Sequence, residues 1–171
     1  MARNVEIKAR IASLAALEPL AAALSGAAPV RIAQDDTFFT CANGRLKLRD
    51  FGNGTGELIF YRRADATGPK ESFYLISPTA SPDTLREVLA LAHGVIGRVR
   101  KQRTLFMAGR TRIHLDRVEG LGEFLELEVV LRDGESVEAG VAEAHELLAS
   151  LQVAPDQLQS GAYLDLLAQR P

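Results

Sequence analysis

Four stretches of the chain carry a charged or polar side chain at every second position, with apolar side chains between them. They are residues 4–10, 45–49, 112–116 and 125–129. Successive side chains of a β-strand point to opposite faces, so this spacing predicts strands with one apolar face and one charged face. A surface strand shows this pattern once or twice. Four such strands, with acids and bases on the same face, predict a closed sheet with a charged interior.

A charged interior is costly unless its charges are compensated. Desolvation penalises each buried ion, and only a close partner of opposite charge or a charged ligand offsets that penalty. We therefore interpret the chain as a container for a metal-bound polyanion.

Composition narrows the classes of protein that this chain represents. Its 171 residues, 47% hydrophobic and 25% charged, are typical of a globular protein, and we expect one domain over residues 1–171. The formal net charge of −2 argues against a general nucleic-acid binder. Cys41 is the only cysteine, which excludes an intramolecular disulfide and a Cys-rich zinc site.

The sequence also lacks several signals of localisation and catalysis. It has neither an apolar signal core at its start nor a run of about 20 apolar residues, so we expect a cytoplasmic protein that does not bind membranes. Walker-type phosphate loops, Gly-x-Ser-x-Gly elbows and Cys/His pairs are missing, which argues against covalent catalysis by a nucleophilic side chain.

The hydrophobic periodicity predicts about eight strands and three or four helices. Ser13 is a candidate N-cap of a first helix that ends at Gly26, and Ser81 precedes Pro82 in an order typical of a second helix start. Short glycine-containing turns join most strands, which predicts antiparallel pairing. The predicted strands are residues 5–11, 31–41, 46–50, 57–63, 73–76, 97–107, 111–118 and 124–132; the last helices are 137–151 and 162–168.

Four acids form a candidate metal site. Glu126 and Glu128 are two positions apart, so their carboxylates point to one side of a strand and can share a hard cation, with Glu6 completing the shell and Asp116 assisting. Ligation by oxygen alone fits Mg²⁺ or Mn²⁺. The alternative is that Glu126 and Glu128 lie on the wet face of an edge strand.

A larger basic set is a candidate phosphate site. A triphosphate needs cations from several directions, and strands that line a barrel provide them. The alternative is salt-bridge pairing on a solvated sheet. Arg62 is a further candidate, although the parity of its strand is ambiguous, and alternation alone does not fix which face of residues 98–103 points inward. The set is Lys8, Arg10, Arg45, Lys47, Arg49, Lys101, Arg103 and Arg112.

His114 lies between Arg112 and Asp116 on the same predicted strand face. We interpret it as a hydrogen-bonded residue of the interior, with a general base as the alternative.

Several of these motifs, in this order, resemble the CYTH superfamily, the triphosphate tunnel metalloenzymes. They are Val5-Glu6-Ile7-Lys8, Gln34-x-Asp36-x-Phe38-Phe39, Lys47-x-Arg49, Lys101-x-Arg103, and Asp116 ten residues before Glu126. The run Arg112-x-His114-Leu115-Asp116-x-Val118-x-x-Leu121-Gly122-x-Phe124-Leu125-Glu126-Leu127-Glu128 is most similar to the class IV adenylyl cyclase branch. The resemblance covers essentially the whole chain.

The resemblance implies an α+β fold in which eight antiparallel strands form a closed or nearly closed barrel, the tunnel, with flanking helices. In the family, basic side chains bind a triphosphate and acids hold one or two divalent ions. The resemblance therefore implies that Lys8, Lys101 and Arg103 are catalytic residues. It also implies that Lys101 and Arg103 are on the face of their strand that points into the tunnel. The family motif Glu-x-Glu-x-Lys has Asn4 in place of its first Glu here, and a neutral ligand changes the affinity for metal or the number of ions.

The resemblance is compatible with two reactions. ATP is cyclised to cyclic AMP and pyrophosphate, or water attacks an inorganic or organic triphosphate. A third interpretation is a binding module for polyphosphate or nucleotide that has lost catalysis with Asn4. We expect ATP or another triphosphate-containing small molecule as the partner, no nucleic acid, and a homodimer as one possible assembly.

Overall fold

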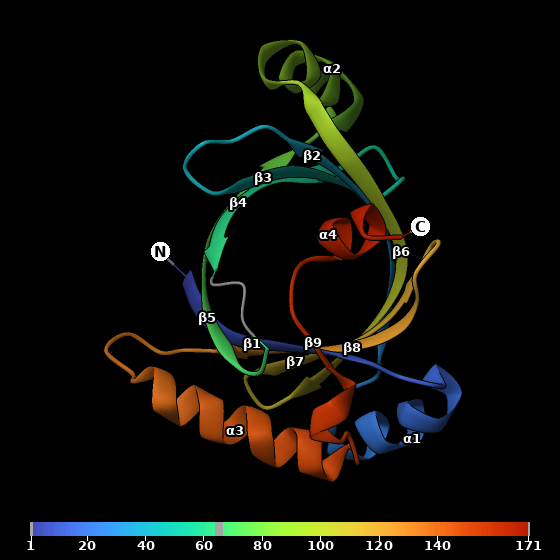
Figure 1. The fold of residues 1–171 in the computed structure, drawn as a ribbon, viewed down its shortest axis with the longest axis vertical. Helices are drawn as coiled ribbons and strands as arrows, with labels where there is room; N and C mark the ends of the chain where they lie inside the picture. Colours follow the sequence, from blue (N-terminus) through green and yellow to red (C-terminus); the bar gives the residue numbers. More distant parts are fainter. Residues whose placement is uncertain (1, 64–66, 171) are drawn as a thin grey trace.

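A computed structural model describes residues 2–63 and 67–170, and Figure 1 shows long strands around a central opening with helices outside and at one end. Their order is β1 (Ala2–Arg10), α1 (Leu14–Leu24), β2 (Val30–Phe39), β3 (Arg45–Asp50), β4 (Gly56–Arg63), β5 (Lys70–Thr79), α2 (Pro82–His93), β6 (Val95–Ala108), β7 (Thr111–Val118), β8 (Gly122–Val130), α3 (Val137–Ser150), a 3₁₀ turn (Pro155–Gln157), β9 (Leu158–Gln159) and α4 (Tyr163–Ala168).

Strand β1 closes the sheet into a ring. The strand order is β5-β4-β3-β2-β6-β7-β8-β1, every pairing is antiparallel, and β1 also pairs with β5, where Val5 lies opposite Glu71. The short β9 pairs with the other half of β1, beside Lys8 and Ala9. Closure satisfies the backbone groups that an edge strand leaves unpaired. The predicted α+β fold with an eight-stranded antiparallel tunnel is therefore confirmed.

Two elements differ from the sequence-based expectation. Strand β5 runs from Lys70 to Thr79 instead of over residues 73–76, because its backbone pairs with β1 over residues 70–74 and with β4 over residues 72–79. Strand β9 is only two residues long, too short for periodicity to predict.

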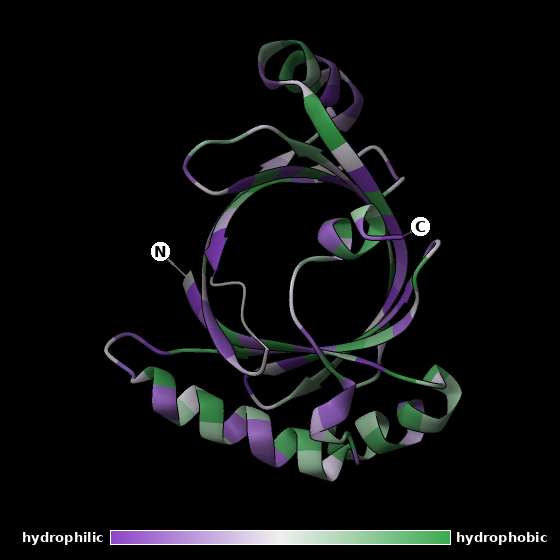
Figure 2. Cartoon of the chain, viewed as in Figure 1, coloured by the Kyte–Doolittle hydropathy of each residue, from purple (hydrophilic) through white to green (hydrophobic). Residues whose placement is uncertain are grey.

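The main core lies outside the ring, beneath α1 and α3. These helices cover β1, β7 and β8, and their apolar residues pack against the outward side chains of those strands (Figure 1). Ile7, Ile113 and Leu127 are fully buried there. Figure 2 shows hydrophobic and hydrophilic positions interleaved along the strands. One set of alternate residues therefore builds the core, and the other set is left to face the tunnel.

The C-terminal segment closes one end of the tunnel. Figure 1 shows α4 within the ring, beside β6. Tyr163 packs in a cluster with Phe38, Val99 and Phe124, and Leu164 packs so closely on Gly97 that a Cβ there would lie 2.3 Å from its Cδ1. This end is thus filled by apolar side chains. Among the described residues, no helix combines the length and the apolar character that a membrane span requires.

Candidate functional site

The inward faces of the strands line a cavity that is rich in charge. Among the described residues, seven Lys or Arg side chains and five carboxylates border it: Lys8, Lys47, Arg49, Arg63, Lys101, Arg103 and Arg112, with Glu6, Asp36, Glu57, Glu126 and Glu128. They come from β1, β2, β3, β4, β6, β7 and β8. Strand alternation brings these residues together, although they are spread over more than a hundred positions of the chain.

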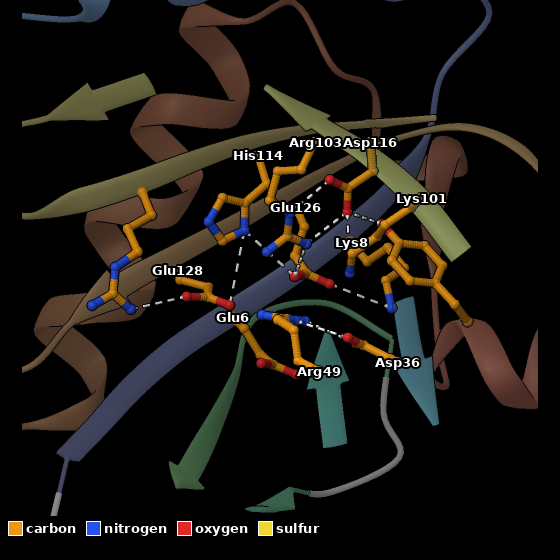
Figure 3. A network of polar contacts seen from close by, with 12 residues as sticks. Glu6, Lys8, Asp36, Arg49, Lys101, Arg103, His114, Asp116, Glu126 and Glu128 are labelled. Atoms are coloured by element: carbon orange, nitrogen blue, oxygen red, sulfur yellow. Dashed lines mark hydrogen bonds and ion pairs between the residues drawn. The ribbon is translucent and has the colours of Figure 1, made fainter. Parts of the chain in front are cut away.

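Arg103 and Asp116 form a buried ion pair at the cavity wall (Figure 3). Arg103 donates from Nε and Nη2 to the two Asp116 oxygens at 2.7 and 2.6 Å, and from Nη2 to Glu126 Oε1 at 3.1 Å. Burial opposes ionisation of Asp116, but Arg103 and Lys101 hold its pKa well below the usual range. Direct cross-strand pairing of Arg103 with Asp116 sets this geometry.

All three lysines among the described cavity residues have lowered pKa values, that of Lys47 through burial and the neighbouring Arg49. Burial lowers the pKa of Lys101 to about 7, with a further contribution from Arg103, while Asp116 opposes the shift. Burial also lowers the pKa of Lys8 to about 8, against the attraction of Glu126, whose Oε2 lies 3.5 Å from Lys8 Nζ. Perturbed pKa values of this kind are concentrated at functional sites.

Asp36 compensates the two cations of β3. Lys47 Nζ donates to it at 2.7 Å, and Arg49 donates from Nε and Nη2 at 2.8 Å each. Burial opposes its ionisation, but Arg49 and Lys47 hold the pKa of Asp36 well below its usual range. Asp36 thereby holds both cations at the cavity, and Figure 3 shows Arg49 pointing toward it.

Arg63 supplies a further cation, from β4. It is ion-paired with Glu6, and its Nε is buried without a hydrogen-bond partner. Its neighbour Arg62 is exposed and lies over the rings of Phe60 and Phe73. Of the two arginines, Arg63 is the one that reaches the tunnel.

Three residues on neighbouring strands converge as candidate metal ligands. His114 Nδ1 is 3.5 Å from Glu126 Oε1 and 3.8 Å from Glu128 Oε1, and one ligand atom of each residue lies within 4.8 Å of the others (Figure 3). Burial raises the pKa of Glu128, but His114 and Arg103 outweigh it and the pKa is lowered. Two carboxylates and a buried imidazole nitrogen fit a divalent cation.

Tyr163 joins the C-terminal segment to the charged interior. Its hydroxyl donates to Asp116 Oδ2 at 2.8 Å, and its ring lies 4.0 Å from Lys8 Nζ and 4.9 Å from Lys101 Nζ. Lys8 also donates to the carbonyl of Gly161 at 3.1 Å. The segment that closes the tunnel therefore also positions two of its lysines.

The structure places most, but not all, of the candidate residues at the cavity. Glu6, Lys8, Lys47, Arg49, Lys101, Arg103, Arg112, Glu126 and Glu128 line it, and Asp116 lies directly behind Arg103. Arg98 and Arg100 point outward and pair with Asp35, so the register with Lys101 and Arg103 inside is the one observed.

Three predicted phosphate ligands lie elsewhere. Arg10 is exposed and donates to the Leu121 carbonyl at 2.9 Å, and Arg45 makes a two-pronged ion pair with Asp165 of α4. Arg62 is on the outer face, as described above. Arg10 and Arg45 are at inward-facing positions of β1 and β3, but they lie at the end of the tunnel where the C-terminal segment packs.

Sequence reasoning missed Arg63, Tyr163 and the pairing role of Asp36. Alternation along β4 places Arg63 on the inward face once Ile59 and Tyr61 are recognised as inward, so the sequence carried a signal for it. No local signal marks Tyr163, because its place depends on how the C-terminal segment folds back into the ring. Asn4 is where the motif predicted, at the cavity, with Oδ1 buried and without a partner.

A protein-family model, the CYTH domain, matches residues 2–163. The comparison with curated proteins gives no match.

Solved structures show the same fold. PH1012 from Pyrococcus horikoshii is 22% identical with a TM-score of 0.84, covering 96% of this chain and 99% of its own. A protein from Vibrio parahaemolyticus, described as a candidate adenylate cyclase, is 18% identical with a TM-score of 0.73 and coverages of 96% and 97%. HpAC1 from Hippeastrum, described as having a dominant triphosphatase activity, is 17% identical with a TM-score of 0.66 and coverages of 96% and 95%.

We predict that Asp116→Asn destabilises the protein strongly, because it leaves the buried Arg103 without a full counter-charge. The expected loss in the free energy of unfolding is about 3 to 5 kcal/mol, measured by urea denaturation. Glu71→Gln is the matched control: its partner Arg3 forms an exposed ion pair, and the expected change is about 0.2 to 1 kcal/mol. Equal losses in the two variants would contradict the role given to Asp116.

Proposed function

Because the chain belongs to the CYTH family, we propose that it is a metal-dependent enzyme that acts on a triphosphate held in this tunnel, and that it converts ATP to cyclic AMP and pyrophosphate. The observation that carries this proposal is the convergence of Lys8, Lys47, Arg49, Arg63, Lys101 and Arg103 on one cavity from four strands. Cations on several sides match the shape of a phosphate chain, which carries charge along its length.

The two kinds of cation have complementary uses at such a ligand. Arg49 and Arg103 present planar forks that are already oriented by Asp36 and Asp116, and the lysines act as point charges on single phosphate oxygens. Each cation is held in place before the ligand arrives. Binding a triphosphate then costs little side-chain entropy, which favours affinity.

The distribution of charged and apolar side chains along the tunnel supports one orientation of a bound nucleotide. On β6 the inward residues run from Val99, which packs in the cluster with Tyr163, through Lys101 and Arg103 to Leu105. Ile32 and Ile76 also line the cavity. In the proposed complex, the phosphates lie among the lysines and arginines, and the nucleoside lies toward Ile32, Ile76 and Leu105, away from the end that the C-terminal segment fills.

For cyclisation, the ribose 3′-hydroxyl gives up its proton to solvent as its oxygen bonds to the α-phosphorus, and the bond from that phosphorus to the bridging oxygen of pyrophosphate breaks. Negative charge then develops on the leaving pyrophosphate, where Lys8, Lys101 and Arg103 neutralise it. Glu126, Glu128 and Glu6 are the carboxylates that would hold Mg²⁺ or Mn²⁺. When bound, such an ion polarises phosphoryl oxygens and offsets their charge.

A triphosphatase is the second candidate, and the similarity to HpAC1 supports it. The same cations would grip an inorganic or organic triphosphate, and water would replace the ribose hydroxyl as nucleophile. The two reactions differ in the nucleophile and in the phosphorus that it attacks.

The direct test is to incubate the purified protein with ATP, and separately with inorganic triphosphate, with Mg²⁺ or Mn²⁺, and to identify the products by mass. We expect cyclic AMP and pyrophosphate from ATP. ADP and phosphate from ATP, or phosphate and pyrophosphate from triphosphate, would establish the triphosphatase instead. No turnover of either substrate, with binding retained, would contradict both reactions and favour a binding module.

We predict that Lys101→Met weakens triphosphate binding by about 10- to 100-fold, because the variant loses one charge-assisted hydrogen bond to the ligand. Binding is measured by calorimetry with inorganic triphosphate. Arg100→Met is the control, because Arg100 is the adjacent residue and points outward to Asp35. A loss of affinity in Arg100→Met alone would reverse the assignment of faces.

Lys101→Met is also expected to be at least as stable as the wild type at pH 6. Because burial lowers the pKa of Lys101 to about 7, its charged form costs stability below that pH, and the cost shrinks as pH rises toward 10.5, the ordinary lysine pKa. The gain in Lys101→Met should therefore be larger at pH 6 than at pH 9 in urea denaturation. A variant that is less stable at pH 6 would contradict this.

A further inference from the structure

We infer that His114 is a nitrogen ligand of the divalent ion, and that it makes this site select Mn²⁺ over Mg²⁺. The inference rests on the proposed function, because it concerns the ion of the same tunnel. It assigns to His114 a role different from the hydrogen-bonded residue that its sequence position suggested.

The first observation is the geometry of three facing side chains. His114 and Glu126 are direct cross-strand partners on β7 and β8, and Glu128 follows two positions later on the same face. Their ligand atoms lie within 4.8 Å of one another, and His114 Nδ1 is 3.5 and 3.8 Å from the nearest oxygens of the two glutamates. Ligand atoms about 2 Å from one ion lie about 3 to 4 Å apart, so only small side-chain movements are needed.

The second observation is independent of the acidic pair. His114 is 4% exposed, and its Nδ1 is buried without a hydrogen-bond partner in the described part of the chain. A buried polar atom of this kind is costly unless a ligand or an ion satisfies it. Because Nδ1 is aimed at two carboxylates, a cation is the group that satisfies it.

The other acids near this point are held by cations, as Glu126 and Glu128 are by Arg103 and Arg112. Glu6 is ion-paired with Arg63, and both Asp116 oxygens accept hydrogen bonds from Arg103. Asn4 is neutral where the family motif has its first Glu. The imidazole therefore adds a nitrogen ligand to the carboxylates of this site.

An imidazole ligand changes which metal the site prefers. Mg²⁺ takes oxygen ligands almost exclusively, whereas Mn²⁺ is a first-row transition ion for which nitrogen and carboxylate oxygen are both suitable ligands. The strand pairing that fixes His114 and Glu126 also makes the ligand set rigid, which strengthens the selection. The competing explanation is a protonated imidazole that is ion-paired with both glutamates and has no contact with metal.

The test is to titrate the full-length protein with Mn²⁺ alone, to follow free Mn²⁺ by electron paramagnetic resonance, and then to compete with Mg²⁺. For His114→Gln we expect a loss of Mn²⁺ affinity of about 10-fold or more, the scale of effect seen when metal-site residues are mutated, with Mg²⁺ affinity nearly unchanged. His145→Gln, at an exposed position of α3, is the matched control and should behave as wild type. An unchanged Mn²⁺ to Mg²⁺ affinity ratio in His114→Gln would overturn the inference.

A second measurement does not depend on how the variant folds. Electron spin-echo spectra of Mn²⁺ bound to the wild-type protein should contain modulation from an imidazole ¹⁴N, and the control variant should retain it. Its absence from the wild type would overturn the inference.

Binding of inorganic triphosphate is measured on the same samples to separate this inference from the proposed function. If triphosphate binds and turns over while the ¹⁴N signal is absent, only the role of His114 fails. If the ¹⁴N signal is present while triphosphate neither binds nor turns over, the proposed function fails and the metal ligand stands.

Discussion

Charge compensation inside a closed sheet is the constraint on which the rest of this structure depends. Asp36 holds Lys47 and Arg49, Asp116 holds Arg103, and Glu6 holds Arg63. Closure of the ring forces these groups out of bulk water, so each needs a partner within the tunnel. The same pairs aim the cations at one cavity, which links the stability of the fold to the polyanion binding that we propose for it.

The fold was largely predictable because its determinants are local. Period-two alternation identified the strands, glycine turns implied antiparallel pairing, and the parity of Lys101 and Arg103 followed from the family motif. The two-residue β9 was too short to detect. The length of β5 is fixed by its two neighbours, and its own sequence carries a weaker signal.

The site was predictable only in part, because the signals in the sequence are local. Alternation gives the face of a residue but not its depth in the tunnel, so Arg10 and Arg45 were assigned to phosphates although they lie at the end occupied by α4. A one-residue uncertainty in β4 placed Arg62 inside in place of Arg63. Tyr163 and the convergence of His114 with Glu126 and Glu128 depend on three-dimensional packing that no short motif encodes.

The most direct test of the central claim is a crystal structure of the protein soaked with inorganic triphosphate and Mn²⁺. We expect phosphate density within hydrogen-bond distance of Lys8, Lys101 and Arg103, inside the ring. Density bound only on the outer face, at Arg62, or a tunnel without phosphate at saturating ligand, would contradict it.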